Sequence, residues 1–544
     1  MVTLPATLLA TLPYAVSKES LESVADAIRA AGKTHDKLVF PDGFIAAIDS
    51  IATGSGVKND VNFYDYDGSI VDSYSAKEFL ELDAMPQNPT HAGLISQGWN
   101  WTLEIAKTFV RSNGMLEIGQ MYKPESGATE IDVTLTAPYL SPTISIAPNG
   151  TVTVDWGDGS ETVELAGTST ITPKFASHTY GEAGSYTIKL TVANDGFFCF
   201  YGGDSKTRAI LSPKKDALGY SNVYTNDITA IRVGENVGFG TYALNYCESM
   251  RYITLPDSTV KGIQISNGAF ANCSAIKHLT LPIGTTVFAD NAALNDRSLK
   301  TISLPQNMTQ FGVNAFNNCG VLERVTIPGT VVKISDAMFT KCQSLIEVTM
   351  HNGISALGSY SFMDCKSLEE ITIPEAIKTI PMNCFEGCIS LRTLSIPKAV
   401  TQIQNNAFRG CSSLTDVTLG SGLTRIMQDA FSSCYSLRRI SFPSNVYQIG
   451  NYAFSNCYSL EEINLDRGTP PTLGGTYTFS SLPSTCVIYV PYTEDHSVLN
   501  AYKSAQYWSA YASQMVELVI APEDEVIIPD PEIVSGDDDG GGAG

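Results

Sequence analysis

The chain has 544 residues, enough for several domains, and its 56 acidic residues against 34 basic ones give a formal net charge of −22. This charge argues against nucleic acid or an anionic membrane as a main partner. No run approaches the ~20 apolar residues of a membrane span, so we expect no membrane partner. The 44 glycines and 26 prolines are typical of a loop-rich β protein.

Residues 1–56 are predicted to form a helical attachment segment followed by a linker. Apolar residues recur at helical spacing in two short stretches, the first from Leu21 to Ile28 and the second from Phe44 to Ile51. Helices this short are marginal alone, so we expect the segment to dock on another surface. The apolar start of the chain lacks the basic region of a secretory signal.

The stretch SVADAIRAAGKTHDKLVFPDGFIAAIDSIATG resembles a segment of tail and virion proteins of phages that infect Gram-positive gut bacteria. This resemblance implies a virion attachment or assembly region, with other virion structural proteins as partners. From the missing basic region we expect either a protein that is made in the cytosol and carried outside on a particle, or a mature fragment.

Residues 57–125 are predicted to form a small aromatic-rich α+β module. A turn at Asp67 lies between apolar and aromatic flanks and predicts a hairpin. The segment carries five aromatic residues of interest: Phe63, Tyr64, Tyr66, Trp99 and Trp101. Because aromatic side chains dominate small cores, we interpret them as a compact core. A sugar-stacking platform is the alternative.

Residues 126–195 contain several alternating strand patterns. The fragments VDWGDG, HTY and GSY occur here in order, and with them the segment resembles the polycystic-kidney-disease (PKD) type β-sandwich. The resemblance implies an Ig-like spacer or weak binder with Trp156 in its core. Asp155, Asp158 and Glu161 could hold Ca²⁺, but carboxylates beside a turn also cap backbone amides. Because a calcium site needs six or more oxygens, we favour amide capping.

Residues 229–482 follow a period of 23 residues, after an irregular N-terminal cap at 196–228. Ala-Phe, two variable residues, Cys and Ser-Leu recur in register, followed by an Ile-Thr-Ile-Pro segment. Cysteines mark the period at Cys319, Cys342, Cys365, Cys388, Cys411, Cys434 and Cys457. A fixed period of this length predicts a solenoid, in which each coil buries its apolar face on the next.

One coil illustrates the expected strand. In the coil that ends at Cys388, Ile371 and Ile373 should face the interior, while Glu370 and Thr372 point outward. A proline then ends the strand, because it has no amide to donate to the next ladder position.

We interpret the cysteine column as a ladder of buried thiols. Disulfides are compatible with the distances, but the side chains should point in parallel and Asp296 occupies one place in the column. Zinc is disfavoured because no Cys-x2-Cys pair occurs. A second column of phenylalanines, from Phe270 to Phe454, is interpreted as stacked core side chains.

The repeated phrase resembles the BspA-type leucine-rich repeat over roughly residues 229–466. The resemblance implies a binding and adhesion scaffold, common in microbes of animal mucosa, and no reaction. The module at 57–125 resembles one found beside such repeats in phage and gut bacterial proteins. The predicted fold class is multidomain and mainly β: a leucine-rich repeat solenoid preceded by an Ig-like β-sandwich and a small helical segment.

Two columns of side chains should cover the outer face of the strands. The hydroxyl column consists of Thr280, Ser303, Thr326, Thr349, Thr372, Ser395, Thr418 and Ser441. The neighbouring column varies from coil to coil, and from it we predict a receptor-binding face made of His278, Arg324, Glu347, Glu370, Asp416, Arg439 and Glu462. Such solenoids bind through extended surfaces, although an ordinary solvated face has the same composition.

After the repeats, residues 483–520 predict a strand and a helix that cap the solenoid. Residues 521–544 form an acidic, glycine-rich tail that we expect to be disordered or weakly docked.

The sequence contains no recognisable catalytic motif. G-x-S-x-G, H-E-x-x-H and P-loop motifs do not occur, and the six histidines are scattered without metal spacing. A loose dinucleotide fingerprint at 238–243 lacks the βαβ context that it needs. We therefore predict no enzymatic activity, no catalytic residues, no metal site and no cofactor.

Together these features favour a non-enzymatic phage virion protein, such as a tail fibre or receptor-binding appendage, located on the virion. Its expected partner is a bacterial surface protein or glycan. A bacterial cell-surface adhesin of the BspA type and a structural decoration of the virion are the alternatives. A homo-oligomer is a further option, although no coiled-coil heptad supports it.

Overall fold

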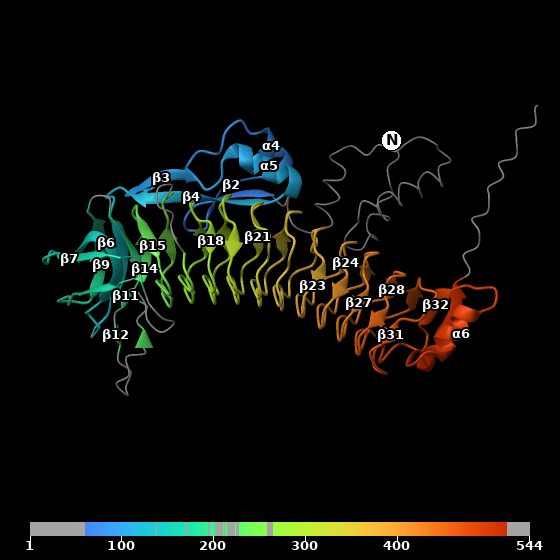
Figure 1. Ribbon diagram of the computed structural model, residues 1–544. Helices are drawn as coiled ribbons and strands as arrows, with labels where there is room; N and C mark the ends of the chain where they lie inside the picture. The colour runs from blue at the N-terminus through green and yellow to red at the C-terminus, as the bar shows by residue number, and fades with distance from the viewer. Residues whose placement is uncertain are drawn as a thin grey trace, which may run out of the picture.

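The computed structural model describes residues 60–518, with gaps at 138, 170–171, 194–195, 202–209, 212, 215–222, 225–227 and 258–264. The predicted helical segment at 1–56 and the tail at 521–544 lie outside the described residues. The described chain is a long solenoid with a sheet domain at its N-terminal end and a small α+β module along its first half (Figure 1). It is mainly β and has about 12 turns with a ~23-residue period, so the predicted solenoid is confirmed.

The module is a sheet covered on one side by two helices. Its strands are β1 (Val61–Tyr64), β2 (Ile70–Tyr74), β3 (Leu94–Trp99) and β4 (Leu116–Pro124), and its helices are α4 (Ala76–Glu81) and α5 (Leu103–Asn113). The strand order is β2-β1-β4-β3. A reciprocal capping box between Ser75 and Glu78 starts α4. The predicted hairpin joins β1 to β2, with Gly68 at a φ of +86°.

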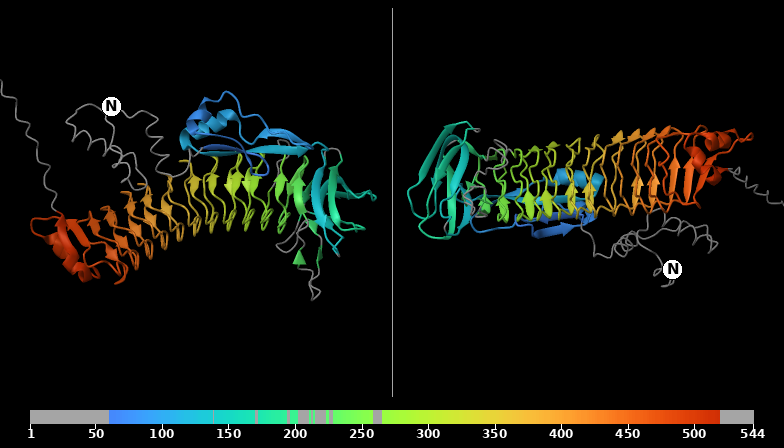
Figure 2. Two further views of the ribbon diagram at one scale, coloured as in Figure 1. Left: turned by 180° about the vertical axis from the view of Figure 1, so that it is seen from behind. Right: turned by 90° about the horizontal axis from the view of Figure 1, so that it is seen from below.

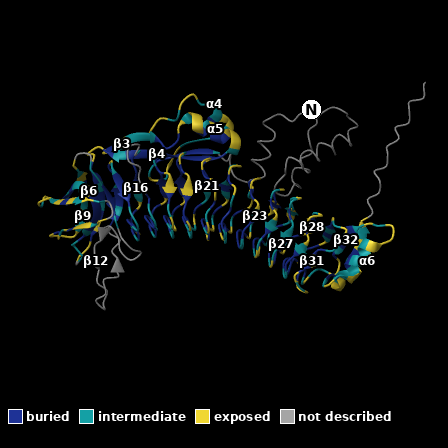
Figure 3. Ribbon diagram, in the orientation of Figure 1, coloured by how far each residue is buried: buried dark blue, intermediate teal, exposed yellow. Residues whose placement is uncertain are grey.

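The aromatic residues of the module form a hydrophobic core beneath its helices. The ring centroid of Phe63 lies 6.1 Å from that of Phe79 and 4.9 Å from that of Trp99. The cluster comprises Val61, Phe63, Phe79, Trp99, Trp101, Ala106, Phe109, Val110, Leu116 and Ile118. The compact-core interpretation is therefore correct for Phe63, Trp99 and Trp101, whereas Tyr64 and Tyr66 contact the solenoid. Figure 3 shows exposed residues on α4 and α5, on the side of the module that lies away from the solenoid.

The sheet domain is built around one long strand, β6 (Thr143–Asp155), which pairs with five others. The remaining strands are β5 (Thr129–Leu135), β7 (Val163–Thr168), β8 (Lys174–Ser177), β9 (Gly184–Val192), β10 (Phe197–Phe200) and β11 (Ile210–Leu211). Trp156 is buried, and its carbonyl accepts a hydrogen bond from the Tyr180 hydroxyl at 2.7 Å. A separate pair, β12 (Pro213–Lys214) and β13 (Val223–Tyr224), precedes the solenoid.

The sheet domain continues directly into the solenoid. The first solenoid strands are β14 (Ile228–Arg232), β15 (Val237–Phe239) and β16 (Tyr252–Thr254), and β14 pairs with β5 while β15 pairs with β10. One hydrophobic cluster of described residues runs from Ile131 in β5 to Met515 near the end of the solenoid. The two parts therefore share a single continuous core.

Most of the later coils contribute one outward-facing strand and one shorter strand. The outward strands are β17 (His278–Thr280), β19 (Thr301–Ser303), β21 (Arg324–Thr326), β22 (Glu347–Thr349), β24 (Thr393–Ser395), β26 (Asp416–Thr418), β28 (Arg439–Phe442), β30 (Glu462–Leu465), β32 (Val487–Pro491) and β33 (Met515–Leu518). The shorter strands are β18 (Val287–Phe288), β20 (Gln310–Phe311), β23 (Thr379–Ile380), β25 (Gln402–Ile403), β27 (Arg425–Ile426), β29 (Gln448–Ile449) and β31 (Thr472–Leu473). Neighbouring strands are parallel and in register (Figure 2).

One coil departs from the predicted pattern. No strand is assigned at residues 368–374, although Ile373 is buried and Thr372 is exposed, as alternation predicts. The expected strand through Glu370 is therefore wrong. In a continuous sheet Glu370 would lie directly opposite Glu347, and like charges in that position weaken strand pairing. Before this coil the outward strands form the separate pairs β17-β19 and β21-β22, and after it a six-stranded sheet starts at β24.

The third side of each coil turns through two left-handed residues four positions apart. In successive coils these pairs are Asn314 and Asn318, Ala337 and Lys341, Tyr360 and Asp364, Asn383 and Gly387, Asn406 and Gly410, Asp429 and Ser433, and Tyr452 and Asn456. Asn, Asp and Gly are frequent at these places because they tolerate positive φ better than other residues. The recurrence of Asn, Asp and Gly at a spacing of four residues therefore indicates a turn, which we did not predict from the sequence.

The cysteine and phenylalanine columns form the interior, as predicted. The cysteines of the described chain are all buried and none is in a disulfide. Cys388 Sγ lies 3.2 Å from the carbonyl oxygen of Phe362 in the previous coil, and this contact recurs along the column. Asp296 takes one place in the column by accepting the Cys273 N–H at 2.7 Å. The Phe362 and Phe385 rings stack at 5.2 Å.

The thiols should be unreactive in the folded protein. Burial raises the pKa of the Cys388 thiol well above its ordinary value, so little thiolate forms. We expect iodoacetamide at pH 8 to leave the column unlabelled and to modify all twelve cysteines after denaturation without reductant. Mass spectrometry would measure both states. Labelling that requires a reductant would support the disulfide alternative instead.

The C-terminal cap contains the predicted strand and helix. After β32 the chain forms α6 (Ser497–Ser504) and a 3-10 helix, η1 (Trp508–Gln514), and then adds β33 to the edge of the sheet. Tyr502 and Trp508 are buried against the last coil, where the Trp508 indole donates to the Pro471 carbonyl at 2.7 Å. The apolar end of the solenoid is thereby covered.

Candidate functional site: the outward strand face

The outward face of the solenoid has the same side-chain types along its length but very different exposure. At its first coils Thr280, Ser303 and Thr326 are buried, whereas Ser395 and Thr418 in the same column are exposed. Strand alternation points the side chains of both groups away from the core, so the conformation of their own strands does not explain the difference in exposure. Another part of the chain covers the first coils.

The cover is the module. Its strand β4 contacts β14, β16, β17, β19 and β21, and it runs along the solenoid axis across these strands (Figures 1 and 2). At the crossing, Gly119 lies directly on the hydroxyl column. A Cβ at this position would be 2.1 Å from Thr280 Oγ1 and 2.8 Å from Ser303 Cβ. Only glycine permits the sheets to approach this closely.

Two residues after β3 tie the module to the backbone of the coils. Asn100 Nδ2 donates to the carbonyls of Leu281 and Ser303, each at 3.1 Å, and its Oδ1 accepts the Gly119 N–H at 2.9 Å. The Trp101 indole donates to the carbonyl of Leu304 at 2.7 Å. These bonds fix the module in register with β17 and β19.

The cover removes His278 from the predicted receptor-binding face. This residue is 1% exposed, and its ring stacks on Tyr64 of the module with centroids 4.9 Å apart. Its ring nitrogens lie 2.7 Å from Thr301 Oγ1 and 2.9 Å from Thr280 Oγ1. Burial lowers the pKa of His278 to about 3, so the ring is neutral. The prediction that His278 faces a receptor is wrong, because residues of the module cover it.

Arg324 and Glu347 lie at the border of the covered region. Their side chains are 15% and 37% exposed, and Arg324 Nε lies 3.7 Å from Glu347 Oε2. Burial lowers the pKa of the Arg324 guanidinium, while the Glu347 carboxylate opposes this change. These two residues bind each other beside the module.

The remaining predicted residues lie on the uncovered part. We call this part the open face; it consists of the outward sides of β24, β26, β28, β30, β32 and β33, with the irregular coil before them. Glu370, Asp416 and Arg439 are exposed and Glu462 is half-buried. Asp416, Arg439 and Glu462 are directly opposite one another on adjacent strands. The structure thus brings together four of the seven predicted residues.

Charge alternates in sign from coil to coil across the open face. The residues at the strand starts are Glu369 and Glu370, then Arg392, then Asp416, then Arg438 and Arg439, then Glu461 and Glu462. Arg392 Nε lies 3.8 Å from Glu369 Oε2. Opposite charges on adjacent strands attract, so the pattern stabilises the stacking and also gives the face a banded electrostatic surface.

Two tyrosines beside the open face were missed by the sequence prediction. Tyr435 and Tyr458 each follow a column cysteine, are 47% and 57% exposed, and have ring centroids 5.7 Å apart. They lie in the same coils as Arg438 and Glu461. Exposed Tyr and Arg are the residue types most enriched at binding hot spots. The sequence contained a signal for these tyrosines, because most coils have a small or polar residue directly after the column cysteine.

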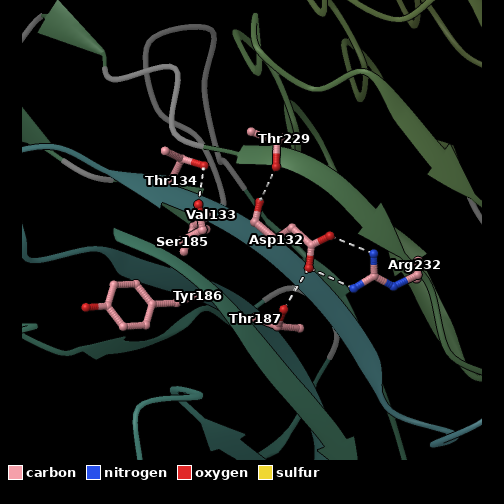
Figure 4. A pocket seen from close by; sticks show the side chains of 8 residues that line it. All are labelled: Asp132, Val133, Thr134, Ser185, Tyr186, Thr187, Thr229 and Arg232. Atoms are coloured by element: carbon pink, nitrogen blue, oxygen red, sulfur yellow. Dashed lines mark hydrogen bonds and ion pairs between the residues drawn. The ribbon is translucent and has the colours of Figure 1, made fainter. Parts of the chain in front are cut away.

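A cavity of about 350 Å³ lies where the sheet domain meets the solenoid. Figure 4 shows that Arg232 reaches from β14 to Asp132 on β5. Its guanidinium binds both oxygens of Asp132, at 2.6 and 2.7 Å, and Glu130 at 3.0 Å. The charged groups of this cavity satisfy one another, so we assign it a structural role.

Two acidic residues of the sheet domain cap backbone amides. No group of three or more His, Cys, Asp and Glu side chains among the described residues is arranged to hold a metal ion. Asp155 accepts the Gly157 N–H at 2.9 Å and Asp158 accepts the Ser160 N–H at 3.0 Å, which is the amide capping that we favoured. None of the helices in the described chain is long and apolar enough to span a membrane.

A family model described as the BspA type leucine rich repeat region matches residues 182–295, 217–346, 263–392 and 355–483, together more than half of the chain. The chain belongs to the BspA-type leucine-rich repeat family. The predicted family is therefore confirmed for the repeats. The resemblances of residues 126–195 to a PKD-type sandwich and of residues 17–51 to phage proteins stay predictions.

Three bacterial proteins are among the solved structures with a similar fold. A leucine-rich repeat protein from Bacteroides ovatus is 23% identical, with 55% of this chain and 90% of that chain covered and a TM-score of 0.39. A leucine-rich cell surface protein from Faecalibacterium prausnitzii is 24% identical (43% and 79% covered, TM-score 0.25). The pneumococcal vaccine antigen PcpA is 15% identical (53% and 84% covered, TM-score 0.26). No curated protein matches the BspA-type chain.

Proposed function

We propose that this BspA-type protein is a non-enzymatic adhesin that presents its open face to a protein or glycan on a cell surface. The observation that carries the proposal is the accessible six-stranded sheet, whose outward side chains are exposed while those of the first coils are covered. A rigid stacked core holds this face in one shape. Preorganised faces of this kind lose little entropy on binding.

Either a phage particle or a bacterial cell could carry this adhesin on its surface. The predicted attachment segment at 1–56 lies outside the described residues, so the virion location, the virion partners and the alternative of a bacterial cell surface all stay proposals. Immunogold labelling of phage particles and of the producing bacterium distinguishes the two carriers. A structural decoration protein differs from both, because its open face would be buried against a neighbouring subunit.

Binding of the purified full-length chain to gut bacterial cells tests the proposal. We expect Tyr435→Ala combined with Arg438→Glu and Arg439→Glu to weaken binding at least about tenfold, because anchor residues of these types each contribute about 2 kcal/mol or more. Flow cytometry with a fluorescently labelled protein would measure it.

Lys378→Glu is the matched control, because Lys378 is exposed beside the shorter strand β23, away from the open face. It should leave binding unchanged. Absence of cell binding by the unmodified chain, or an equal loss in the control, would count against the adhesin role.

A further inference from the structure

The sheet domain and the module are joined to the solenoid in different ways. The sheet domain shares one hydrophobic cluster with the coils, so it cannot separate from them without exposing core side chains to water. The module has a second, distinct cluster formed by its own described residues. Separation of the module would therefore leave both hydrophobic cores intact.

The contact between module and coils combines hydrogen bonds with aromatic ring contacts and contains a buried carboxyl group. Glu117 in β4 is 2% exposed, and its Oε2 atom has no hydrogen-bond partner among the described residues. Its Oε1 atom accepts a hydrogen bond from Asn62 Nδ2 at 3.3 Å, and the Tyr64 hydroxyl also hydrogen-bonds the carboxyl group. A buried carboxylate without full pairing costs free energy. Contacts between parts of one chain commonly permit relative motion unless they are large and hydrophobic.

We propose that residues 60–124 form a releasable cover of the strand face, held in place by this contact. Release exposes the outward sides of β16, β17, β19 and β21, and the open face then extends along nearly the whole solenoid. The inference rests on the proposed function, since the uncovered surface belongs to the same binding face. Release itself is a property of the isolated protein and is measured without a partner.

The ionisation of Glu117 makes the contact depend on pH. Burial raises the pKa of Glu117 to about 7, against smaller opposite effects of Tyr64 and Asn62, and Glu347 on β22 raises it further. Arg324 on β21 lies in the same region and is paired with Glu347. Glu323, which precedes β21, adds a further negative charge near Tyr64.

The sign of the effect follows from the two protonation states. Docked Glu117 holds its proton more tightly than released Glu117, which has the ordinary pKa of a glutamate near 4.5. Docking is therefore strongest in acid and weakens as the pH rises from that value towards 7. Linkage predicts about tenfold more released module at pH 8 than at pH 6.

Hydroxyl-radical footprinting of the full-length chain, read by mass spectrometry, tests the proposal. His278 and Tyr64 are buried in the contact and become accessible on release. Phe79 and Trp99 belong to the core of the module and become accessible only if the module unfolds. We expect labelling of His278 and Tyr64 to rise about tenfold from pH 6 to pH 8, with Phe79 and Trp99 still protected.

Three variants complete the test. Gly119→Val introduces the clash with Thr280 and should label His278 and Tyr64 strongly at both pH values while Trp99 stays protected. Glu117→Gln removes the ionisable group and should abolish the pH dependence. Glu104→Gln changes an exposed residue of α5 and is the matched control for Glu117→Gln. This variant should retain the pH dependence of labelling.

Two results would overturn the proposal: continued protection of His278 in Gly119→Val, or simultaneous labelling of His278 and Trp99, which would show the module and contact unfolding as one unit. The proposed function can fail separately. A pH-dependent release without any cell binding would reject the adhesin role and keep the releasable cover.

Discussion

Replacing Phe385 with alanine is expected to destabilise the solenoid by about 3–5 kcal/mol, the cost of removing a fully buried phenylalanine ring. The ring stacks on Phe362 at 5.2 Å and on Phe408 at 5.3 Å. The backbone ladders on either side hold the coils at a set spacing, so neighbouring residues cannot move in to fill the cavity. Urea-induced unfolding followed by circular dichroism would measure the loss.

Phe175→Ala is the control for this substitution. Phe175 in β8 is 63% exposed, so the same chemical change removes little buried surface. We expect it to alter stability by less than about 0.5 kcal/mol. Equal effects of the two substitutions would contradict the stacked-core description of the phenylalanine column.

Arg232→Met is expected to cost about 2–3 kcal/mol at pH 7, because it leaves two carboxylates without their shared counter-ion at the junction of sheet domain and solenoid. The cost is below that of a fully buried pair, since the Asp132 side chain is 28% exposed. Arg392→Met, at an exposed ion pair with Glu369, is the control and should change stability by about 0.5 kcal/mol or less.

The effect of Arg232→Met should depend on pH in a defined direction. Burial opposes ionisation of Asp132, but hydrogen bonds from Arg232 and Thr187 outweigh it and hold the pKa of Asp132 below its ordinary value. The stability from this pair is present above the ordinary pKa of aspartate and is lost as the pH falls through the folded value. Unfolding curves of the two proteins should therefore converge below about pH 4. A difference that persists in acid would contradict this origin.

Much of the fold was predictable because the repeat carries strong local constraints. The cysteine and phenylalanine columns and the alternation of buried Ile373 with exposed Thr372 follow from a period that places the same residue type at the same place in every coil. The confirmed solenoid rests on this regularity. The missing strand at Glu370 was within reach too, because two glutamates 23 residues apart, Glu347 and Glu370, must oppose each other in a parallel sheet.

The candidate site was only partly predictable. Strand alternation predicts which side chains point away from the core. For Asp416 and Arg439 these outward side chains are also exposed. The outward side chain of His278 is buried instead, because Tyr64, more than two hundred residues earlier in the chain, packs on its ring. No periodic pattern links these two positions, and Gly119 offered no sign that it lies on Thr280.

The amino-acid sequence determined that this chain stacks regular coils around an apolar core, because each coil repeats the side chains that bury its neighbour. Only the tertiary structure decided which coils keep an accessible strand face. That outcome depends on whether two separately folded sheets fit each other closely enough, and here one glycine and the amide of Asn100 supply the fit between residues far apart in the chain.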